Sequence, residues 1–322
     1  MRLVVSSRLL PLVFATALGL SSAAAAQSFF SVDAASPSVP GVNNSDVLAP
    51  GVPLVVAVPA AANGIAGAPF DELNAMTAGG PLGVLLFSVD RAAVGIPGGP
   101  PDVASEAAAG QAAGDVFTSA LGGANGLVIN QALQGLIPAA PPGAPVVPPI
   151  DDLDALDVPG MPPVLFALAP GHPLLGASAL VGCGADLFGP GGGPAIPFGA
   201  LGLGACADDI DALHLDAGTG DLYFSLAPGS PSLAPGSPIA GCGGGCSPAD
   251  VFIAIGGVGP SGIFAPAGAL GLLPTDNLNA LAFDPPPPPT VVPLMPIWAF
   301  ALLVVALIGV TWWLRPGRSR SS

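Results

Sequence analysis

The chain contains no lysine, and of its six arginines only Arg91 lies between residues 27 and 290. All 21 acidic residues fall within that span, from Asp33 to Asp284, so the span carries a net charge of −20. A surface of this sign repels nucleic acid and anionic lipid headgroups, which argues against nucleic acid as a partner. Either the charge only keeps the protein dispersed, or it attracts cations such as Ca²⁺.

Aromatic residues and catalytic motifs are also scarce in this span. It has no tryptophan and one tyrosine, Tyr223, so it lacks the aromatic platforms usual in sugar-binding sites. The two histidines, His172 in a loop and His214 in an expected strand, lack the spacing of metal ligands and are expected to be ordinary surface or core residues. No nucleophile elbow, phosphate loop or zinc-protease motif is present. We therefore expect that the protein is not an enzyme.

Glycine and proline, at 46 and 41 residues, make up over a quarter of the chain. Such a composition is common in disordered chains, but half of the residues in this chain are hydrophobic, and disorder requires low hydrophobicity. Prolines and glycines separate short apolar runs, which excludes long helices and predicts strands joined by turns. The exception is the alanine-rich segment 105–119, for which we expect a short helix.

The first 26 residues predict a secretory signal peptide. Arg2 and Arg8 give a positive start, residues 9–20 form an uncharged apolar segment, and residues 24–26 are three alanines suited to cleavage. A retained membrane anchor is disfavoured because the apolar segment is too short to span a bilayer.

The C-terminal end predicts a membrane anchor. Residues 297–314 carry no charge, and at about 1.5 Å per residue they nearly cross a hydrocarbon core of roughly 30 Å. Tryptophans lie at both ends of this segment, and the tail 315–322 contains three arginines, so we expect a transmembrane helix followed by a basic cytoplasmic tail. Residues 285–296 form the preceding linker, which begins with five prolines that act as a stiff spacer.

This order of short motif, apolar helix and basic tail resembles a bacterial C-terminal sorting signal. Residues 292–299, VPLMPIWA, are similar to the IPTL-CTERM type, whose motif runs Ile-Pro-Thr-Leu, two residues, then Trp-Gly. Pro293 and Trp298 match, Met295 is a mild replacement, and Leu294 departs from the motif, while the Pro-Glu-Pro of the related PEP-CTERM type is absent. The resemblance implies display on a Gram-negative cell, with a sorting protease as a partner, and implies nothing about the rest of the chain.

Three short signatures recur four times each, in a fixed order, between the two ends. F-S-[VL] begins at Phe30, Phe87, Phe166 (where Ala replaces Ser) and Phe224. D-[VL]-[FL] begins at Asp46, Asp115, Asp186 and Asp250, and [LI]-[DN]-A-[LM] begins at Leu73, Leu153, Ile210 and Leu278. The Phe residues of the first signature lie 57, 79 and 58 positions apart, and the variation falls in Gly- and Pro-rich connections, as expected of surface loops.

Each signature suits a β-strand, and about four strands fit each unit. Repeated four-stranded sheets predict an all-β fold, a four-unit β-propeller over residues 27–284, with a β-sandwich or a β-solenoid as the alternatives. The strands are apolar on both sides, as they must be if each blade packs between two others. The chain opens on the first signature and closes on the third, so we expect the N- and C-terminal strands to complete one sheet together and seal the ring.

Acidic residues concentrate at the third signature. Their side chains either set turns by accepting backbone N–H groups or provide oxygen ligands for Ca²⁺, although the spacing is not that of an EF-hand. Recurrence in every unit favours the structural role. Ca²⁺ is the one cofactor considered, and its candidate ligands are Asp151, Asp152, Asp154, Asp208, Asp209 and Asp211.

Four cysteines lie in the part of the chain expected to be exported. An even number in an oxidising setting predicts disulfides, and we expect the pairs Cys183–Cys206 and Cys242–Cys246, the second closing a CGGGC loop. A four-cysteine zinc site is the alternative, disfavoured because the usual C-x₂-C pairs are missing.

These features predict an exported bacterial protein whose non-catalytic repeat domain acts as a binding or structural module. We expect it in the cell envelope, anchored by its C-terminal helix with the body outside the cytoplasm, or released after processing. The alternatives are an extracellular hydrolase that uses paired carboxylates, with or without Ca²⁺, and a cation-binding matrix protein.

Overall fold

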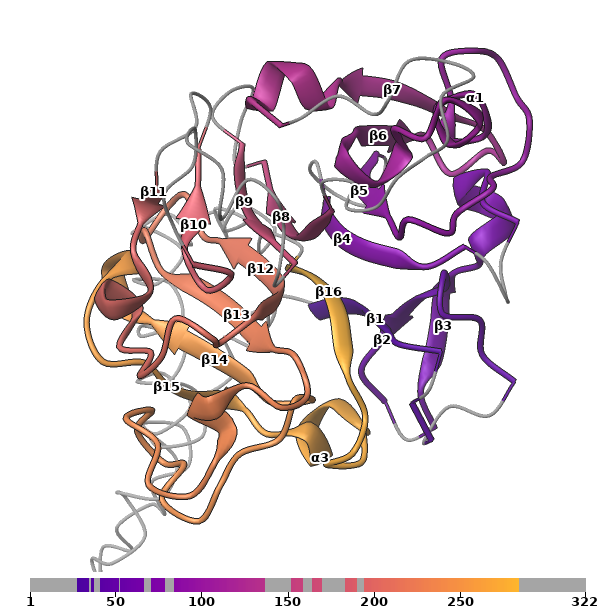
Figure 1. Ribbon diagram of the computed structural model, residues 1–322. Coiled ribbons are helices and arrows are strands. Elements are labelled where there is room, and N and C mark those ends of the chain that lie inside the picture. Colours follow the sequence, from indigo (N-terminus) through magenta and orange to yellow (C-terminus); the bar gives the residue numbers. More distant parts are fainter. Residues whose placement is uncertain are drawn as a thin grey trace, which may run out of the picture. The chain divides into compact units, whose positions relative to one another are not determined.

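The computed structural model describes residues 28–34, 36–37, 41–51, 53–66, 71–78, 84–136, 152–158, 164–169, 183–189 and 194–283. These residues belong to one structural unit, Ala26–Pro285. It contains four antiparallel four-stranded sheets that surround a common centre as the blades of a β-propeller (Figure 1). The prediction of a four-bladed all-β fold is therefore confirmed, and the sandwich and solenoid alternatives are wrong.

Each blade runs from an inner strand at the centre of the ring to an outer strand at its edge. From inner to outer, blade A contains β16 (Leu278–Phe283), β1 (Ser28–Val32), β2 (Val47–Ala49) and β3 (Val55–Val58). Blade B contains β4 (Leu73–Ala78), β5 (Leu85–Val89), β6 (Val116–Ser119) and β7 (Asn125–Ile129). Blade C contains β8 (Leu153–Asp157), β9 (Leu165–Leu168), β10 (Leu187–Phe188) and β11 (Pro194–Ile196), and blade D contains β12 (Ile210–Leu215), β13 (Leu222–Leu226), β14 (Val251–Ala254) and β15 (Gly262–Ala265).

Blade A is completed by both ends of the described chain, as the sequence predicted. β1 pairs antiparallel with β16, from Ser28 opposite Phe283 to Val32 opposite Leu278. On its other side β1 pairs with β2, where Phe30 lies opposite Leu48. The N-terminal strand thus sits between the last strand and the rest of blade A, and this pairing closes the ring.

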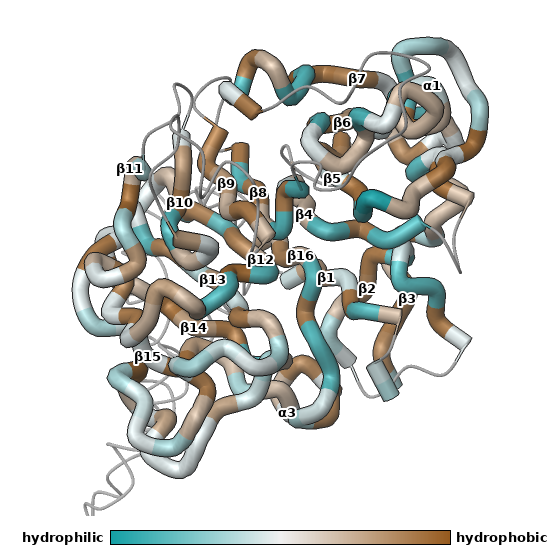
Figure 2. The backbone as a smooth tube through the Cα atoms, viewed as in Figure 1, coloured by the Kyte–Doolittle hydropathy of each residue, from teal (hydrophilic) through white to brown (hydrophobic). Residues whose placement is uncertain are grey.

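The hydrophobic core is divided into four clusters, one at each junction between neighbouring blades. Blades A and B share the cluster around Phe29, Met76 and Phe87. The other junctions have clusters of the same kind, represented by Phe166 between B and C, Leu213 between C and D, and Leu281 between D and A. The inner three strands of each blade are therefore largely buried on both faces, which explains why they are apolar on both sides, whereas the outer strands β3, β11 and β15 are partly exposed. In Figure 2 hydrophilic colour appears along inner strands such as β4 and β16.

The first signature provides two kinds of contact. Its Phe packs against the residue opposite on the third strand of the same blade, giving the ring pairs Phe87–Phe117, Phe166–Phe188 and Phe224–Phe252 at centroid distances of 5.9, 5.9 and 5.7 Å. Its Ser is fully buried and donates a hydrogen bond to the first carbonyl of the next blade's inner strand. These bonds run from Ser31 to Leu73, from Ser88 to Leu153 and from Ser225 to Leu278, at 3.1, 3.2 and 3.0 Å.

A fourth repeated element, which was not predicted from the sequence, follows the outer strand of every blade. It is a short helical turn: η1 (Ala60–Asn63), η3 (Gln131–Gln134), η4 (Phe198–Leu201) and α3 (Ala267–Leu270). Each turn ends at a glycine with φ between 73° and 83°, namely Gly64, Gly135, Gly202 and Gly271. The first backbone N–H of each turn donates to the Asp of the second signature, at 2.7–2.8 Å.

The helix expected over residues 105–119 is wrong in extent. The observed α1 covers Val103–Ala109, begins with a capping box between Asp102 and Ser105, and ends at Gly110 in the left-handed region. The 3-10 turn η2 (Ala112–Gly114) follows, and Val116 already belongs to β6. The reason is that Asp115–Phe117 is a copy of the second signature, whose role in the blade requires a strand. Two further 3-10 turns, η5 (Pro231–Leu233) and η6 (Ile255–Gly257), lie in blade D.

Both expected disulfides form, Cys183–Cys206 and Cys242–Cys246, so the zinc alternative is not needed for these cysteines. Within the part of the chain that the structure describes, no helix is long and apolar enough to cross a membrane. The signal peptide 1–26, the linker 285–296 with Pro293 and Met295, the helix 297–314 with Trp298, and the tail 315–322 lie outside the described residues and stay predictions.

Candidate functional site

The inner strands β16, β4, β8 and β12 contact one another around the centre of the ring, and each carries the third signature. Polar residues occupy the position just before the signature and its second position. The second position lies at a β-bulge in every blade, where the pairing with the next strand shifts by one residue. We call these eight residues the axial cluster: Glu72, Asn74, Asp152, Asp154, Asp209, Asp211, Asn277 and Asn279.

The axial residues of the four blades occupy equivalent positions. In each blade the residue after the second strand donates its backbone N–H to the carbonyl of the residue just before the signature. The acceptors are Asn277, Glu72, Asp152 and Asp209, at 3.1, 3.1, 3.3 and 3.0 Å. A shared register of this kind brings the polar positions of all four inner strands to the same end of the ring.

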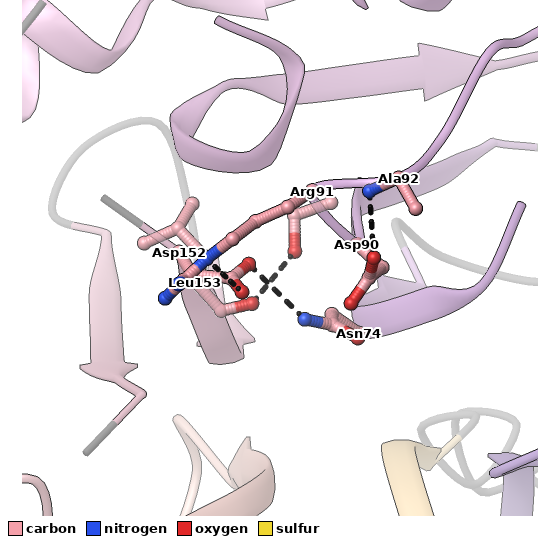
Figure 3. Close-up of polar contacts among 7 residues, drawn as sticks. Asn74, Asp90, Arg91, Ala92, Asp152 and Leu153 are labelled. Carbon is pink, nitrogen blue, oxygen red and sulfur yellow. Dashed lines mark hydrogen bonds and ion pairs between the residues drawn. The ribbon is translucent and has the colours of Figure 1, made fainter. Parts of the chain in front are cut away.

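The junction of blades B and C contains a cation, Arg91, which contacts the cluster. The Arg91 Nε atom lies 2.9 Å from the Asp152 Oδ2 atom, and the Asn74 Nδ2 atom donates to the Asp152 Oδ1 atom at 3.2 Å. Figure 3 shows Arg91 and Asn74 directed toward Asp152. Asp152 is thus satisfied on both oxygens and is the only axial acid with an ion pair among the described residues.

The other three junctions are joined by amides and carboxyls. The Asn279 Nδ2 atom donates to the Glu72 Oε1 atom at 2.6 Å, and the Asn277 Nδ2 atom donates to the Asn279 Oδ1 atom at 2.9 Å. Asp211 shares a hydrogen bond with Asn277, and Asp154 shares one with Asp209. Two neighbouring carboxyls can share a hydrogen bond only when one of them holds a proton.

Burial in this crowded acidic setting raises the pKa of every axial carboxyl. Desolvation is the largest cause in each case, and it raises the pKa of Glu72, Asp152 and Asp209 to about 7. For Asp154 and Asp211 the pKa lies well above the usual value, because burial is reinforced by the charge of Asp209. The hydrogen bond between the two carboxyls raises the pKa of Asp154 further and lowers the pKa of Asp209.

The Asn277 Oδ1 atom of the cluster is buried and has no hydrogen-bond partner. Asn277 is only 8% exposed. Buried polar atoms in folded proteins nearly always have a partner, so an unpartnered group calls for an explanation, such as a bound ion or water.

Other acids of the signatures have structural roles. Asp208, one of the candidate calcium ligands, uses both oxygens to accept from Ser232 N, Ser232 Oγ and Ala205 N at 2.7, 2.6 and 3.1 Å. Asp71 similarly accepts from Val94 N and Gly95 N, and Asp276 from Leu273 N. Asp208 therefore sets a turn, as the structural interpretation expected, and lies outside the axial cluster. Asp151 lies outside the described residues.

The remaining predicted residues are placed as follows. Asp152, Asp154, Asp209 and Asp211 come together in the axial cluster. His214 lies toward the other end of β12, with its Nδ1 atom 3.6 Å from the Asp157 Oδ1 atom and its ring beside Phe283. His172 lies outside the described residues. Across the described ranges, no three His, Cys, Asp or Glu side chains converge as a ready metal-binding group.

The aspartates of this site were predicted from the sequence, whereas its other members, Glu72, Arg91 and the three asparagines, were missed. The signal was present, because Asn occupies the second position of the third signature in blades A and B, where blades C and D have Asp. Aligning the four copies would have brought the asparagines to the same ring. Arg91 lies in a turn after β5 and carries no repeat signal, so its pairing with Asp152 depends on the fold.

Comparisons with protein-family models, with curated proteins and with solved structures give no match to this chain, so the function of the site is inferred from its own residues.

Proposed function

We propose that this protein is an exported, non-catalytic bacterial module, displayed at the cell surface or anchored in the envelope by its C-terminal helix, with the propeller body outside the cytoplasm. The observation that carries the proposal is the pairing of all four cysteines as Cys183–Cys206 and Cys242–Cys246. Disulfides persist in oxidising compartments and are rare in the cytoplasm. This setting agrees with the predicted signal peptide and sorting signal at the two ends of the chain.

A scaffold role is supported by how the repeated residues are used. The signature Phe and Ser side chains are buried in blade junctions, and the second-signature Asp holds the turn after the outer strand. Apart from Ala167, which replaces the Ser in blade C, these residues do the same structural task in each blade. What differs from blade to blade is the connections between strands, and surface connections of this kind are where binding residues generally lie on a rigid fold.

Fractionation of cells that carry an epitope-tagged copy, combined with intact-mass measurement, tests the proposal. We expect the body in the envelope or the medium, without residues 1–26, and with a mass that lacks one pair of hydrogens for each disulfide. A protein recovered from the cytoplasm with an intact N-terminus and four free thiols would contradict it.

A hydrolase is the second candidate, and the Asp154–Asp209 pair is the observation that favours it. One carboxyl that holds a proton beside one that is ionised is the combination used in carboxylate-dependent hydrolysis. Against the hydrolase, Asp154 is only 9% exposed, and Asp209 is already hydrogen-bonded to Asp154, which leaves little room for a substrate. A panel of glycoside and ester substrates separates the candidates: turnover that disappears in Asp209→Asn would favour the hydrolase.

A further inference from the structure

We propose that the Cys183–Cys206 disulfide is a redox-sensitive latch between blades C and D, which a dithiol reductant opens while the rest of the ring stays closed. Cys183 lies in the loop before β10 of blade C, and Cys206 lies in the segment that leads into β12 of blade D. The proposal concerns what this disulfide does within the ring, whereas the proposed function concerns where the protein is located, so either can fail alone.

The position of Cys183 is one that the repeat uses for contacts between blades. Cys183 stands three residues before the second-signature Asp186, and Ser247 stands three residues before Asp250 in blade D. Both donate their backbone N–H to the Asp of their own signature, at 2.8 and 2.9 Å. Cys183 and Ser247 are therefore equivalent residues of blades C and D.

The position of Cys206 has an equivalent as well. Cys206 stands two residues before Asp208, and Pro274 stands two residues before Asp276, at the entry to the next blade in each case. The Ser247 Oγ atom donates to the Pro274 carbonyl oxygen at 2.8 Å. The junction between blades D and A thus has a hydrogen bond at the place where the junction between blades C and D has a covalent bond.

The junction between blades C and D depends on this bond because it lacks another. Ala167 replaces the signature Ser, so the hydroxyl that joins each of the other three junctions is missing. The inner part of the junction has its own contacts, namely the core cluster around Leu213 and the hydrogen bond from Leu215 N to the Asp157 Oδ2 atom at 3.1 Å. Opening the disulfide therefore leaves the centre of the ring intact.

The turn η4, which lies between the two cysteines in the sequence, also stays in place. Gly259 of blade D donates its backbone N–H to the Ala200 carbonyl oxygen at 2.7 Å. The segments that lose their attachment on reduction are accordingly the two that flank the cysteines, residues 183–189 and 203–209.

The surroundings of the four cysteines make the latch the more accessible disulfide. Cys206 is exposed and Cys183 is half-buried. Cys242 is fully buried in the core cluster between blades C and D, and Cys246 packs against that cluster. A reducing thiolate must reach a sulfur atom to attack it, so we expect it to attack Cys206 before either sulfur of the second disulfide.

Opening the latch is a thiol–disulfide exchange. One thiolate of the dithiol attacks the Cys206 Sγ atom, the bond between the two cysteine sulfurs breaks, and Cys183 leaves as a thiolate that takes up a proton. The second thiol of the reductant then attacks the mixed disulfide and releases Cys206 as a thiol. Two electrons and two protons pass to the cysteines, and the dithiol becomes a cyclic disulfide.

The experiment is timed reduction of the purified full-length protein with dithiothreitol. Free thiols are trapped with N-ethylmaleimide and located by peptide mass spectrometry. We expect Cys183 and Cys206 to be labelled about tenfold faster than Cys242 and Cys246, or more. In the form reduced only at the latch, hydrogen exchange should be faster in residues 183–189 and 203–209 and unchanged in residues 28–32 and 278–283.

A double variant, Cys183→Ser with Cys206→Ser, removes the latch and places at position 183 the residue that blade D has at position 247. We expect it to fold, with a thermal midpoint lower by about 5–12 °C. The matched control is Ser247→Ala, which removes the hydrogen bond at the equivalent place between blades D and A. It should lower the midpoint by about 1–5 °C and leave the rates of cysteine labelling as in the unmodified protein.

Three results would overturn the proposal. Labelling of Cys242 and Cys246 first, or at the same rate, would show that the latch is not selectively opened. Faster exchange in all four blades after its reduction would show that the disulfide braces the whole ring. Unchanged exchange in residues 183–189 and 203–209 would show that other contacts hold these segments.

Discussion

At the scale of single residues, the four blades can be compared at the Ser of the first signature, because one blade lacks its hydroxyl group. Three blades place a buried Ser at the second position of the first signature, opposite the Ala of the third signature. Blade C has Ala167 there, opposite Ala155. The junction between blades C and D therefore lacks the hydroxyl that joins the other three junctions.

We expect Ser88→Ala to lower the free energy of unfolding by about 1–2 kcal/mol, because it leaves the Leu153 carbonyl without its donor. The reverse change, Ala167→Ser, should raise it by about 0.5–1 kcal/mol by providing a donor for Ile210. Urea unfolding measures both. If Ala167→Ser destabilises the protein as much as Ser88→Ala does, the interblade hydrogen bond is not what the Ser contributes.

At the same scale, the acidic residues show which roles can be predicted from the sequence and which cannot. Counting aspartates at the third signature does not separate Asp208 from Asp209. Both residues precede β12, and Asp208 accepts from the Ser232 backbone N–H, whereas Asp209 shares a hydrogen bond with Asp154 of the neighbouring blade. Which of the two faces points inward depends on the register of the sheet, and the register follows from packing.

At the scale of elements, the signatures predicted the strands well because each is a short apolar run bounded by Gly and Pro. The turn after the outer strand was missed because its sequence varies from AAANG to QALQG, and only the terminal Gly and the following Ile or Leu recur. The expected helix over 105–119 failed for a related reason: alanine content favoured helix, but Gly110 and the second signature ended it.

The recurring Gly of this turn offers a test within one element. Gly271 has φ of 83°, and a Cβ atom there would lie 2.5 Å from the Gly51 carbonyl oxygen, whereas a Cβ at Gly268 would have nothing within 4 Å. We expect Gly271→Ala to destabilise the protein by about 1–3 kcal/mol and Gly268→Ala to leave stability unchanged or slightly higher. Thermal unfolding of the two variants compares them. Equal effects would show that the left-handed turn is not required.

At the scale of the whole molecule, the axial cluster makes stability depend on pH in an unusual direction. The cluster is faced by Asp33, Glu72, Asp90, Arg91, Asp152, Asp154, Asp208, Asp209 and Asp211. The ordinary pKa values are 3.8 for Asp and 4.5 for Glu, and the folded state raises several of them to about 7. Between these pH values the folded state therefore binds more protons than the unfolded state. Stability contributed by these groups is therefore present at low pH and falls as the pH rises through that window.

We expect the protein to be more stable near pH 5 than near pH 7.5, so the midpoint of urea unfolding should fall as the pH rises between these two values. Asp102 and Asp216 have lowered pKa values and contribute stability of the opposite pH dependence. That contribution is lost only when the pH falls below 3.8, the ordinary pKa of Asp. In a double variant, Asp154→Asn with Asp211→Asn, the fall should be smaller. A midpoint that rises steadily from pH 5 to pH 7.5 would contradict the raised pKa values.

The fourfold ring is closed by one pairing, in which β1 completes blade A beside β16. Hydrogen exchange of the full-length protein, read by mass spectrometry, tests it directly. We predict that amides of residues 28–32 and 278–283 exchange as slowly as those of β12 and β13, because all belong to one closed ring. Fast exchange in those two segments, while blades B, C and D stay protected, would show that the ring is open and would contradict the fourfold closure.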